Sequence, residues 1–285
     1  MHQEILMRKL KGSPIYSSSS LKNKKQITER KSQIASMNIS SSQLFISDIH
    51  LSESQPIVSD LFFKTIKKAS KEVCSIYILG DLFEVYLGDD DPSQLVRKVR
   101  KIFKEITDNG VPIFISLGNK DFLLGEDFIR RSGAVLLDDI HIIEQEGERI
   151  LLTHGDLLCT NDKSYQVFRK IVRNDSMQKI FLKLPLTMRS QIASKAMNHT
   201  KQSVNRKKAE IMDVNIAIVE KIMLQKKITR IIHGHTHRPK IHRFSLGGFT
   251  RSRVVLGDWN TPENAKIYVA SGLEKKLINA CDYIR

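Results

Sequence analysis

Short apolar runs that each end at an aspartate, asparagine or histidine constrain this chain more than any other feature. Five such runs are found, at residues 44–46, 75–79, 113–117, 149–153 and 230–232. Runs of this length that are apolar throughout are typical of strands buried on both faces. Apolar residues at helical spacing occur between them, over 57–73, 95–106 and 214–224. On this alternation alone we predict an α/β fold with one doubly wound sheet and helices on its faces.

The polar residues that end these runs are of types that bind metal ions. They lie in the pieces Asp48-Ile49-His50, Gly80-Asp81, Gly118-Asn119-Lys120-Asp121, His154-Gly155-Asp156 and Gly234-His235-Thr236-His237. Each piece taken singly is more often a turn or an inert, hydrogen-bonded histidine than a ligand. Ligands of open α/β sheets, however, gather at the carboxyl ends of strands. The conjunction of all five pieces therefore predicts a metal centre.

The expected donors define the kind of metal centre. They are Asp48, His50, Asp81, Asn119, His154, His235 and His237. Carboxylate, amide and imidazole donors without thiolate suit Mn²⁺, Fe²⁺, Zn²⁺ or Mg²⁺. Seven donors are too many for one ion, whereas a shared carboxylate lets them serve two. Paired ions about 3.5–4 Å apart activate water and clamp the oxygens of a phosphoryl displacement, so we predict a two-metal phosphoesterase.

Residues 160–212 interrupt the strand–helix alternation. They contain no convincing strand, and their apolar residues predict helices with a generous apolar face. Residues 163–212 hold twelve Lys/Arg and two acidic residues, a large part of the +15 net charge. We expect a helical cap over the strand ends. Its charge is explained either by solvated helix faces or by an anionic partner, such as a phosphorylated substrate, a lipid surface or nucleic acid.

The start of the chain differs from the rest. Residues 1–40 are rich in Ser, Lys and Gln, so we expect a disordered extension ahead of a domain over 41–285. Met37 lies just before the first expected strand, and we take it as a candidate for the true start. We expect no signal peptide and no membrane span, and three scattered cysteines favour a reducing compartment.

The five pieces, in this order, resemble the calcineurin-like metallophosphoesterase superfamily. That resemblance implies a four-layer αββα sandwich with a helical insertion in place of a single sheet. Longer tracts are similar to the UDP-2,3-diacylglucosamine diphosphatases of the lipid A pathway, and together they cover nearly all of residues 44–259. Among them are FISDIHLS from Phe45, YILGDLFEVYLGDDDP from Tyr77 and IHGHTHRP from Ile232.

The resemblance implies a reaction and a metal assignment. The pyrophosphate of UDP-2,3-diacylglucosamine would be hydrolysed by metal-activated water attacking the uridine-side phosphorus, giving UMP and 2,3-diacylglucosamine 1-phosphate. Two ions, most often Mn²⁺ in this family, are implied. One would be held by Asp48, His50, Asp81 and His237, and the other by Asp81, Asn119, His154 and His235, with Asp81 bridging. The catalytic residues implied are Asp81, Asn119 and Lys120.

The resemblance also implies which residues contact the substrate. They are Asn119, Lys120, Asp162, Thr200, Val204, Lys207 and His235. The chain departs from the family at Lys120, where arginine is usual, and at Val204, where asparagine is usual. Lysine keeps the charge but loses the planar fork that grips phosphate at two points. Thr200 replaces serine and keeps the hydroxyl.

Partners and alternatives follow from the same observations. We expect a monomer that associates peripherally with the cytoplasmic face of the bacterial inner membrane, without nucleic acid as a partner. The alternative within enzymes is a two-metal phosphoesterase acting on nucleoside polyphosphates or cyclic nucleotides, which should lack an apolar cap. A nucleic-acid-binding protein is the alternative outside enzymes, but the chain has no recognisable nucleic-acid-binding motif.

Overall fold

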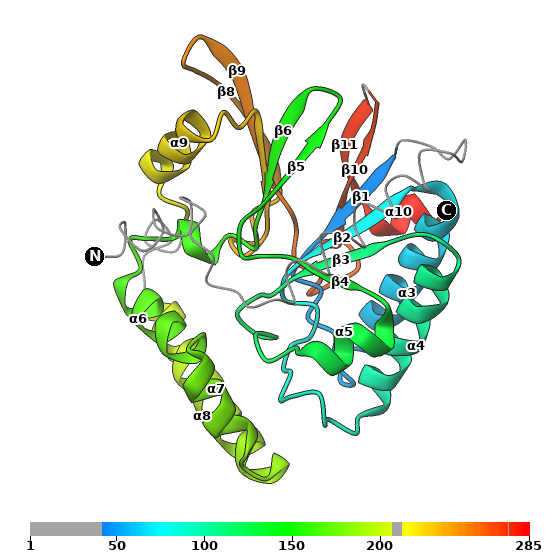
Figure 1. Cartoon of the computed structure of the whole chain (residues 1–285), viewed down its shortest axis with the longest axis vertical. Coiled ribbons are helices and arrows are strands. Elements are labelled where there is room, and N and C mark those ends of the chain that lie inside the picture. Colours follow the sequence, from blue (N-terminus) through cyan, green and yellow to red (C-terminus); the bar gives the residue numbers. More distant parts are fainter. Residues whose placement is uncertain (1–41, 207–212, 273) are drawn as a thin grey trace.

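Two β-sheets lie side by side in the computed structural model, which describes residues 42–206, 213–272 and 274–285 (Figure 1). The first sheet has the order β11 (Glu274–Asn279), β10 (Lys266–Ser271), β1 (Gln43–Ile46), β2 (Ser75–Leu79), β3 (Ile113–Ser116) and β4 (Val135–Leu136). The second has the order β5 (His141–Gln145), β6 (Glu148–Leu152), β7 (Arg230–His233), β9 (Phe249–Val255) and β8 (Lys240–Leu246). The prediction of a single doubly wound sheet is therefore wrong, because burial on both faces identifies a strand without identifying its neighbours.

Parallel pairing brings the predicted strand ends together. Strands β1 to β4 pair in parallel in one sheet, and β6, β7 and β9 pair in parallel in the other. The carboxyl ends of parallel strands meet at one edge of a sheet. Each sheet therefore presents its set of ligand-type residues along one edge.

Helices cover the outer faces of the two sheets. Against the first lie α3 (Pro56–Glu72), α4 (Gln94–Asp108), α5 (Glu126–Ser132) and α10 (Ala280–Ile284), and against the second lies α9 (Ile216–Gln225) (Figure 1). One apolar core lies between α3, α4 and the first sheet, a second between the sheets, and a third beneath α9. This layering confirms the two-sheet sandwich that the family resemblance implies.

Aromatic packing fixes the first sheet against the second. Phe45, Tyr77 and Phe114 come from the adjacent strands β1, β2 and β3 and stack with ring centroids 4.8 Å apart in each consecutive pair. They belong to the core between the sheets, with Ile150 and Ile232 of the second sheet. This packing holds the two rows of strand ends close to each other.

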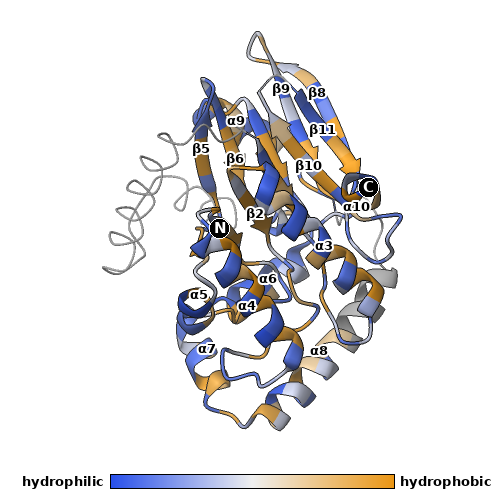
Figure 2. Ribbon diagram, turned by 90° about the vertical axis from the view of Figure 1, so that its right-hand side faces the viewer, coloured by the Kyte–Doolittle hydropathy of each residue, from blue (hydrophilic) through white to orange (hydrophobic). Residues whose placement is uncertain are grey.

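The segment that follows the short turn η1 (Asp156–Leu158) is helical. It forms α6 (Lys163–Val172), α7 (Asp175–Leu182) and α8 (Leu186–Arg206), which project beyond the sandwich (Figures 1 and 2). Hydrophobic and hydrophilic segments alternate along α7 and α8 (Figure 2). The expected extension over 1–40 and the end of the expected insertion, 207–212, lie outside the described residues. Among the helices that the structure describes, none combines the length and apolar character of a bilayer-spanning segment.

Candidate metal centre

A ladder of backbone hydrogen bonds extends the pairing of β1 with β2 into the loops that follow. The amide of Asp48 donates to Gly80 (3.1 Å), that of His50 to Asp81 (3.0 Å), and that of Leu51 to Leu82 (2.9 Å). Loops are normally the most variable part of a fold. Here the ladder fixes Asp48, His50 and Asp81 beside one another.

Unusual backbone conformations single out the same residues. Seven non-glycine residues in the described chain have positive φ, and five of them are predicted ligands: Asp48 (51°), His50 (54°), Asp81 (52°), His235 (67°) and His237 (53°). Left-handed conformations are uncommon outside glycine and persist only where the surrounding structure enforces them. Their concentration at the strand ends indicates a functional site, and sequence patterns do not reveal it.

Two glycines allow the loops to approach the aspartates. A Cβ atom at Gly118 would lie 2.0 Å from Oδ1 of Asp81, and one at Gly234 would lie 2.0 Å from Oδ2 of Asp48. No real side chain tolerates such distances. Glycine is therefore required at both positions for the loops after β3 and β7 to close on the aspartates.

A first group of donors comes from both sheets. Atoms of Asp48, His50 and His237 lie within 4.8 Å of one another, so these residues could hold one ion. Nε2 of His237 lies 3.3 Å from Oδ1 of Asp48. Nε2 of His50 lies 3.9 Å from Oδ2 of Asp81, the fourth predicted ligand of this ion.

A second group is centred on His154. Oδ1 of Asn119 lies 2.9 Å from Nε2 of His154 and 3.0 Å from Nδ1 of His235. Atoms of Asp48, Asp81 and His154 also lie within 4.8 Å of one another. Oδ2 of Asp81 is 3.8 Å from His154 and 3.9 Å from His50, so it lies between the two predicted sets. The position suits a shared ligand, and the assignment of ligands to individual ions stays a prediction.

The charges at this centre fit a divalent cation. Asp48 and Asp81 are buried, and burying charge without a counter-charge is costly. Burial opposes the charge of His50, but the carboxylates of Glu84, Asp81 and Asp48 outweigh it and raise the pKa of His50 to about 9. Burial also lowers the pKa of His154, but the nearby carboxylates outweigh burial and raise this pKa above its ordinary value. The centre thus attracts positive charge, which protons or a metal ion can supply.

The imidazoles also fit the role of ligands. Within the described part of the chain, both ring nitrogens of His50 are buried without an aligned hydrogen-bond partner, and Nδ1 lies 2.9 Å from Oε2 of Glu84 as an ion-pair contact. Nδ1 of His154 is 2.9 Å from the carbonyl oxygen of Leu79 and must donate to it, which directs Nε2 toward the centre. Burial, reinforced by His154, lowers the pKa of His235 to about 4, so that this ring stays neutral as a ligand must be.

Several acidic residues support the centre and were not predicted as functional. Asp121 accepts hydrogen bonds of 2.7 Å from the amides of Gly118 and Leu82, and so ties two ligand loops together. Glu84 lies 2.9 Å from Nδ1 of His50, and Asp258 lies 3.6 Å from Nδ1 of His237. Asp121 belongs to one of the five strand-end pieces, whereas the only signal for Glu84 and Asp258 in the sequence is their position inside the tracts that resemble the diphosphatases.

The predicted substrate residues are only partly gathered at this centre. Asn119 and His235 contact each other there, and Lys120 follows Asn119. Asp162 caps helix α6 by accepting a hydrogen bond of 3.0 Å from the amide of Tyr165, a structural role that spacing alone did not predict. Thr200 and Val204 lie on α8, but their side chains, like the whole of Lys207, fall outside what the structure describes.

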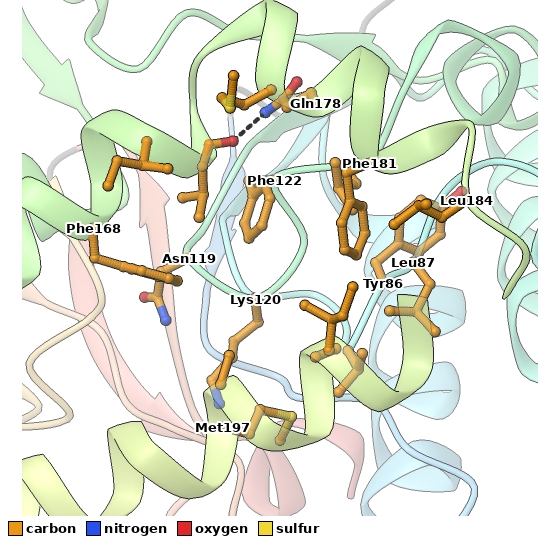
Figure 3. A pocket seen from close by; sticks show the side chains of 18 of the residues that line it. Tyr86, Leu87, Asn119, Lys120, Phe122, Phe168, Gln178, Phe181, Leu184 and Met197 are labelled. Carbon is orange, nitrogen blue, oxygen red and sulfur yellow. Dashed lines mark hydrogen bonds between the residues drawn. The ribbon is translucent and has the colours of Figure 1, made fainter. Parts of the chain in front are cut away.

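An apolar pocket opens beside the centre. Its volume is about 410 Å³, and it lies between the cap helices and the loops after β2 and β3. Figure 3 shows Asn119 and Lys120 among its lining side chains, with Phe122, Phe181 and Met197 around them. The pocket therefore joins a charged end to a hydrophobic interior.

Known proteins are similar to this chain over most of its length. The model of the calcineurin-like phosphoesterase family matches residues 42–239. A UDP-2,3-diacylglucosamine hydrolase of Vibrio parahaemolyticus is 42% identical over 81% of this chain and 96% of its own length. A protein of the same name from Yersinia pseudotuberculosis is 43% identical over 82% and 97%. The solved structure of the phosphoesterase Yfce of E. coli covers 85% of this chain and 94% of its own length, at 15% identity and a TM-score of 0.42.

The family match includes each of the seven predicted metal donors. The similarity to the two hydrolases extends over nearly the whole length of each of them. The chain belongs to the calcineurin-like phosphoesterase family.

Proposed function

We propose that this protein hydrolyses the pyrophosphate bond of UDP-2,3-diacylglucosamine, giving UMP and 2,3-diacylglucosamine 1-phosphate in lipid A biosynthesis. The two relatives that are 42% and 43% identical carry the name of this hydrolase. The observation in this structure that carries the proposal is the apolar pocket that reaches the metal centre at Asn119 and Lys120. A nucleotide sugar with two acyl chains has the same division into an anionic end and a hydrophobic end.

The lining of the pocket favours a lipid over a soluble nucleotide. Its walls come from the core loop at Phe122 and Leu123 and from cap residues such as Phe168, Phe181 and Ile192. Phe168 and Ile192 are exposed in part and, with the rest of the lining, form a contiguous apolar surface of the kind that marks a ligand site. Acyl chains would cover them, at roughly 25 cal/mol for each Å² of apolar surface buried.

The polar end of the pocket suits a phosphate group. The ammonium of Lys120 supplies positive charge, and its backbone amide donates to Oδ1 of Asp81 at 2.9 Å, which places the residue beside the centre. The family and the donor set imply divalent metal ions, for which we propose Mn²⁺. Ions held by these donors would lower the pKa of water and neutralise phosphate charge. The chain's own part is to orient the pyrophosphate and to keep water from the acyl chains.

The tip of the cap suits contact with a membrane surface. Leu182 and Met188 are exposed there, and Lys179 and Lys183 lie beside them. We propose that the protein works as a monomer at the cytoplasmic face of the bacterial inner membrane, with this tip against anionic lipid.

A vesicle experiment tests the membrane contact. We expect the protein to cosediment with vesicles containing phosphatidylglycerol and to be released by high salt. Leu182→Asp combined with Met188→Asp should reduce the bound fraction several-fold, whereas Leu224→Asp, at an exposed position on α9, should not. Equal binding by both variants would contradict a contact through the cap tip.

Release of UMP from UDP-2,3-diacylglucosamine tests the reaction. We expect turnover with Mn²⁺, loss of turnover in a chelator, and little hydrolysis of dinucleoside polyphosphates, which lack acyl chains. Release of UMP rather than UDP would be measured by chromatography. Equal turnover of both substrates would favour the alternative, a phosphoesterase acting on nucleoside polyphosphates.

A further inference from the structure

Glu84 lies between a predicted metal ligand and a predicted substrate residue. Its Oε2 is 2.9 Å from Nδ1 of His50, and its Oε1 is 3.4 Å from Nζ of Lys120. We propose that Glu84 is a positioning residue, which orients His50 toward the metal and Lys120 toward phosphate. The inference rests on the proposed two-metal function.

The backbone holds Glu84 at this place. The amide of Glu84 donates to the carbonyl oxygen of Leu51 at 3.1 Å, and Leu51 forms a parallel bridge with Phe83. Glu84 is thereby part of the same ladder that fixes His50 beside Asp81. The backbone that carries its carboxylate is held by hydrogen bonds. Such support keeps a side chain in a precise position, as a contact with a metal ligand requires.

The contact with Glu84 determines how His50 can bind an ion. The carboxylate of Glu84 lies 2.9 Å from Nδ1, close enough to accept its proton once the ring and the carboxylate align, which would leave the lone pair of Nε2 free; Nε2 lies 3.9 Å from Oδ2 of Asp81. Metal-binding histidines commonly donate their second ring N–H to a carboxylate, which fixes the ring and makes the ligating nitrogen more basic. Glu84 provides that carboxylate for His50.

The second contact restrains Lys120. An ammonium on a four-carbon stem is a flexible point charge, unlike the planar guanidinium of arginine. The backbone of Lys120 is fixed by Asp81, but its side chain is only partly buried, with 24% exposed. The ion pair with Glu84 restrains the ammonium of Lys120 within the pocket lining, beside the residue that contacts His50.

Binding of Mn²⁺ to metal-free protein tests the first contact. By titration calorimetry we expect Glu84→Ala to weaken binding of one of the two ions, the one that His50 would hold, about 10–100-fold relative to the wild type. Glu84→Gln should lose less, because its amide oxygen can still accept the proton of His50. Glu53→Ala, an exposed glutamate in the loop after Leu51, is the matched control and should bind as the wild type does.

Unchanged Mn²⁺ affinity in a folded Glu84→Ala protein would overturn the proposal, with the fold checked by circular dichroism. This readout needs no substrate, so it separates failure of the inference from failure of the proposed reaction.

The second contact is tested by a double-mutant cycle on KM for UDP-2,3-diacylglucosamine. Lys120→Ala should raise KM less in the Glu84→Ala background than in the wild type, and simple additivity would overturn the Lys120 contact.

Discussion

Replacing Asp81 with alanine is expected to lower turnover about a thousandfold. Oδ2 of Asp81 lies 3.9 Å from His50 and 3.8 Å from His154, and so faces a histidine from each predicted ligand set. Its other oxygen anchors the backbone of Lys120. Bound metals contribute several kcal/mol to phosphoryl transfer, and each factor of ten in rate corresponds to about 1.4 kcal/mol. Losing a ligand common to both sets should remove most of that contribution.

The measurement is kcat for UMP release at saturating Mn²⁺, together with the metal content of the purified protein. Asp60→Ala is the control, because Asp60 is an exposed residue of α3 whose carboxylate pairs with Lys64 on the same helix. That variant should keep the wild-type rate. An Asp81→Ala protein with a near-normal rate would refute a shared role for Asp81.

Arg169→Ala is expected to lower the free energy of unfolding by about 3–5 kcal/mol, the usual cost of removing one partner from a buried ion pair. Nε of Arg169 lies 2.6 Å from Oδ2 of Asp156, and its Nη2 lies 3.0 Å from Oδ2 of Asp139. Asp156 and Arg169 are both buried. The melting temperature should fall on the order of 10 °C in a scan by circular dichroism.

An exposed ion pair provides the control for this change. Arg149 pairs with Glu144 on the surface, where such pairs contribute at most about 1 kcal/mol. Arg149→Ala should therefore shift the melting temperature only slightly. If both variants lost the same stability, the buried pair would not be the cause.

The stabilising effect of the buried pair should depend on pH in a defined direction. Burial opposes the charge of Asp156, but Arg169, His154 and Arg173 outweigh it and hold the pKa of this carboxyl far below its ordinary value of 3.8. A carboxyl with a lowered pKa stabilises the fold above its unfolded pKa, and the effect is lost as the pH falls below it. The difference between wild type and Arg169→Ala should therefore be full at pH 7 and shrink below about pH 4.

The sequence predicts the central strands and their helices well because their apolar residues are buried throughout. The prediction for β2, Ser75–Leu79, matches the structure at both ends, and the helices over 57–73 and 95–106 shift by at most two residues. The hairpin of β8 and β9 was missed. Its first strand alternates exposed and half-buried residues and carries charges such as Arg243, which hides the apolar signal. Gly247-Gly248 between the strands was the available turn signal.

The candidate site was predictable to the extent that it follows strand ends. Parallel pairing brings Asp48, Asp81 and Asn119 to one edge, as the alternation of strands and helices predicts. The supporting contacts were not predictable, because Glu84 and Asp258 meet their histidines only through the packing of the loops. Which strands join which sheet is equally a tertiary property that burial patterns do not encode.

The pairing of β1 with β10 has a consequence during protein synthesis. β1 is the first described strand to leave the ribosome, yet its antiparallel partner spans residues 266–271, near the end of the chain. Likewise, the amide of His235 binds the carboxylate of Asp48 across 187 positions. Contacts this far apart in sequence form slowly and leave strand edges open meanwhile. The first sheet can therefore close only after residues 266–271 have been synthesised, and the metal donors can come together only after His235 and His237 have emerged.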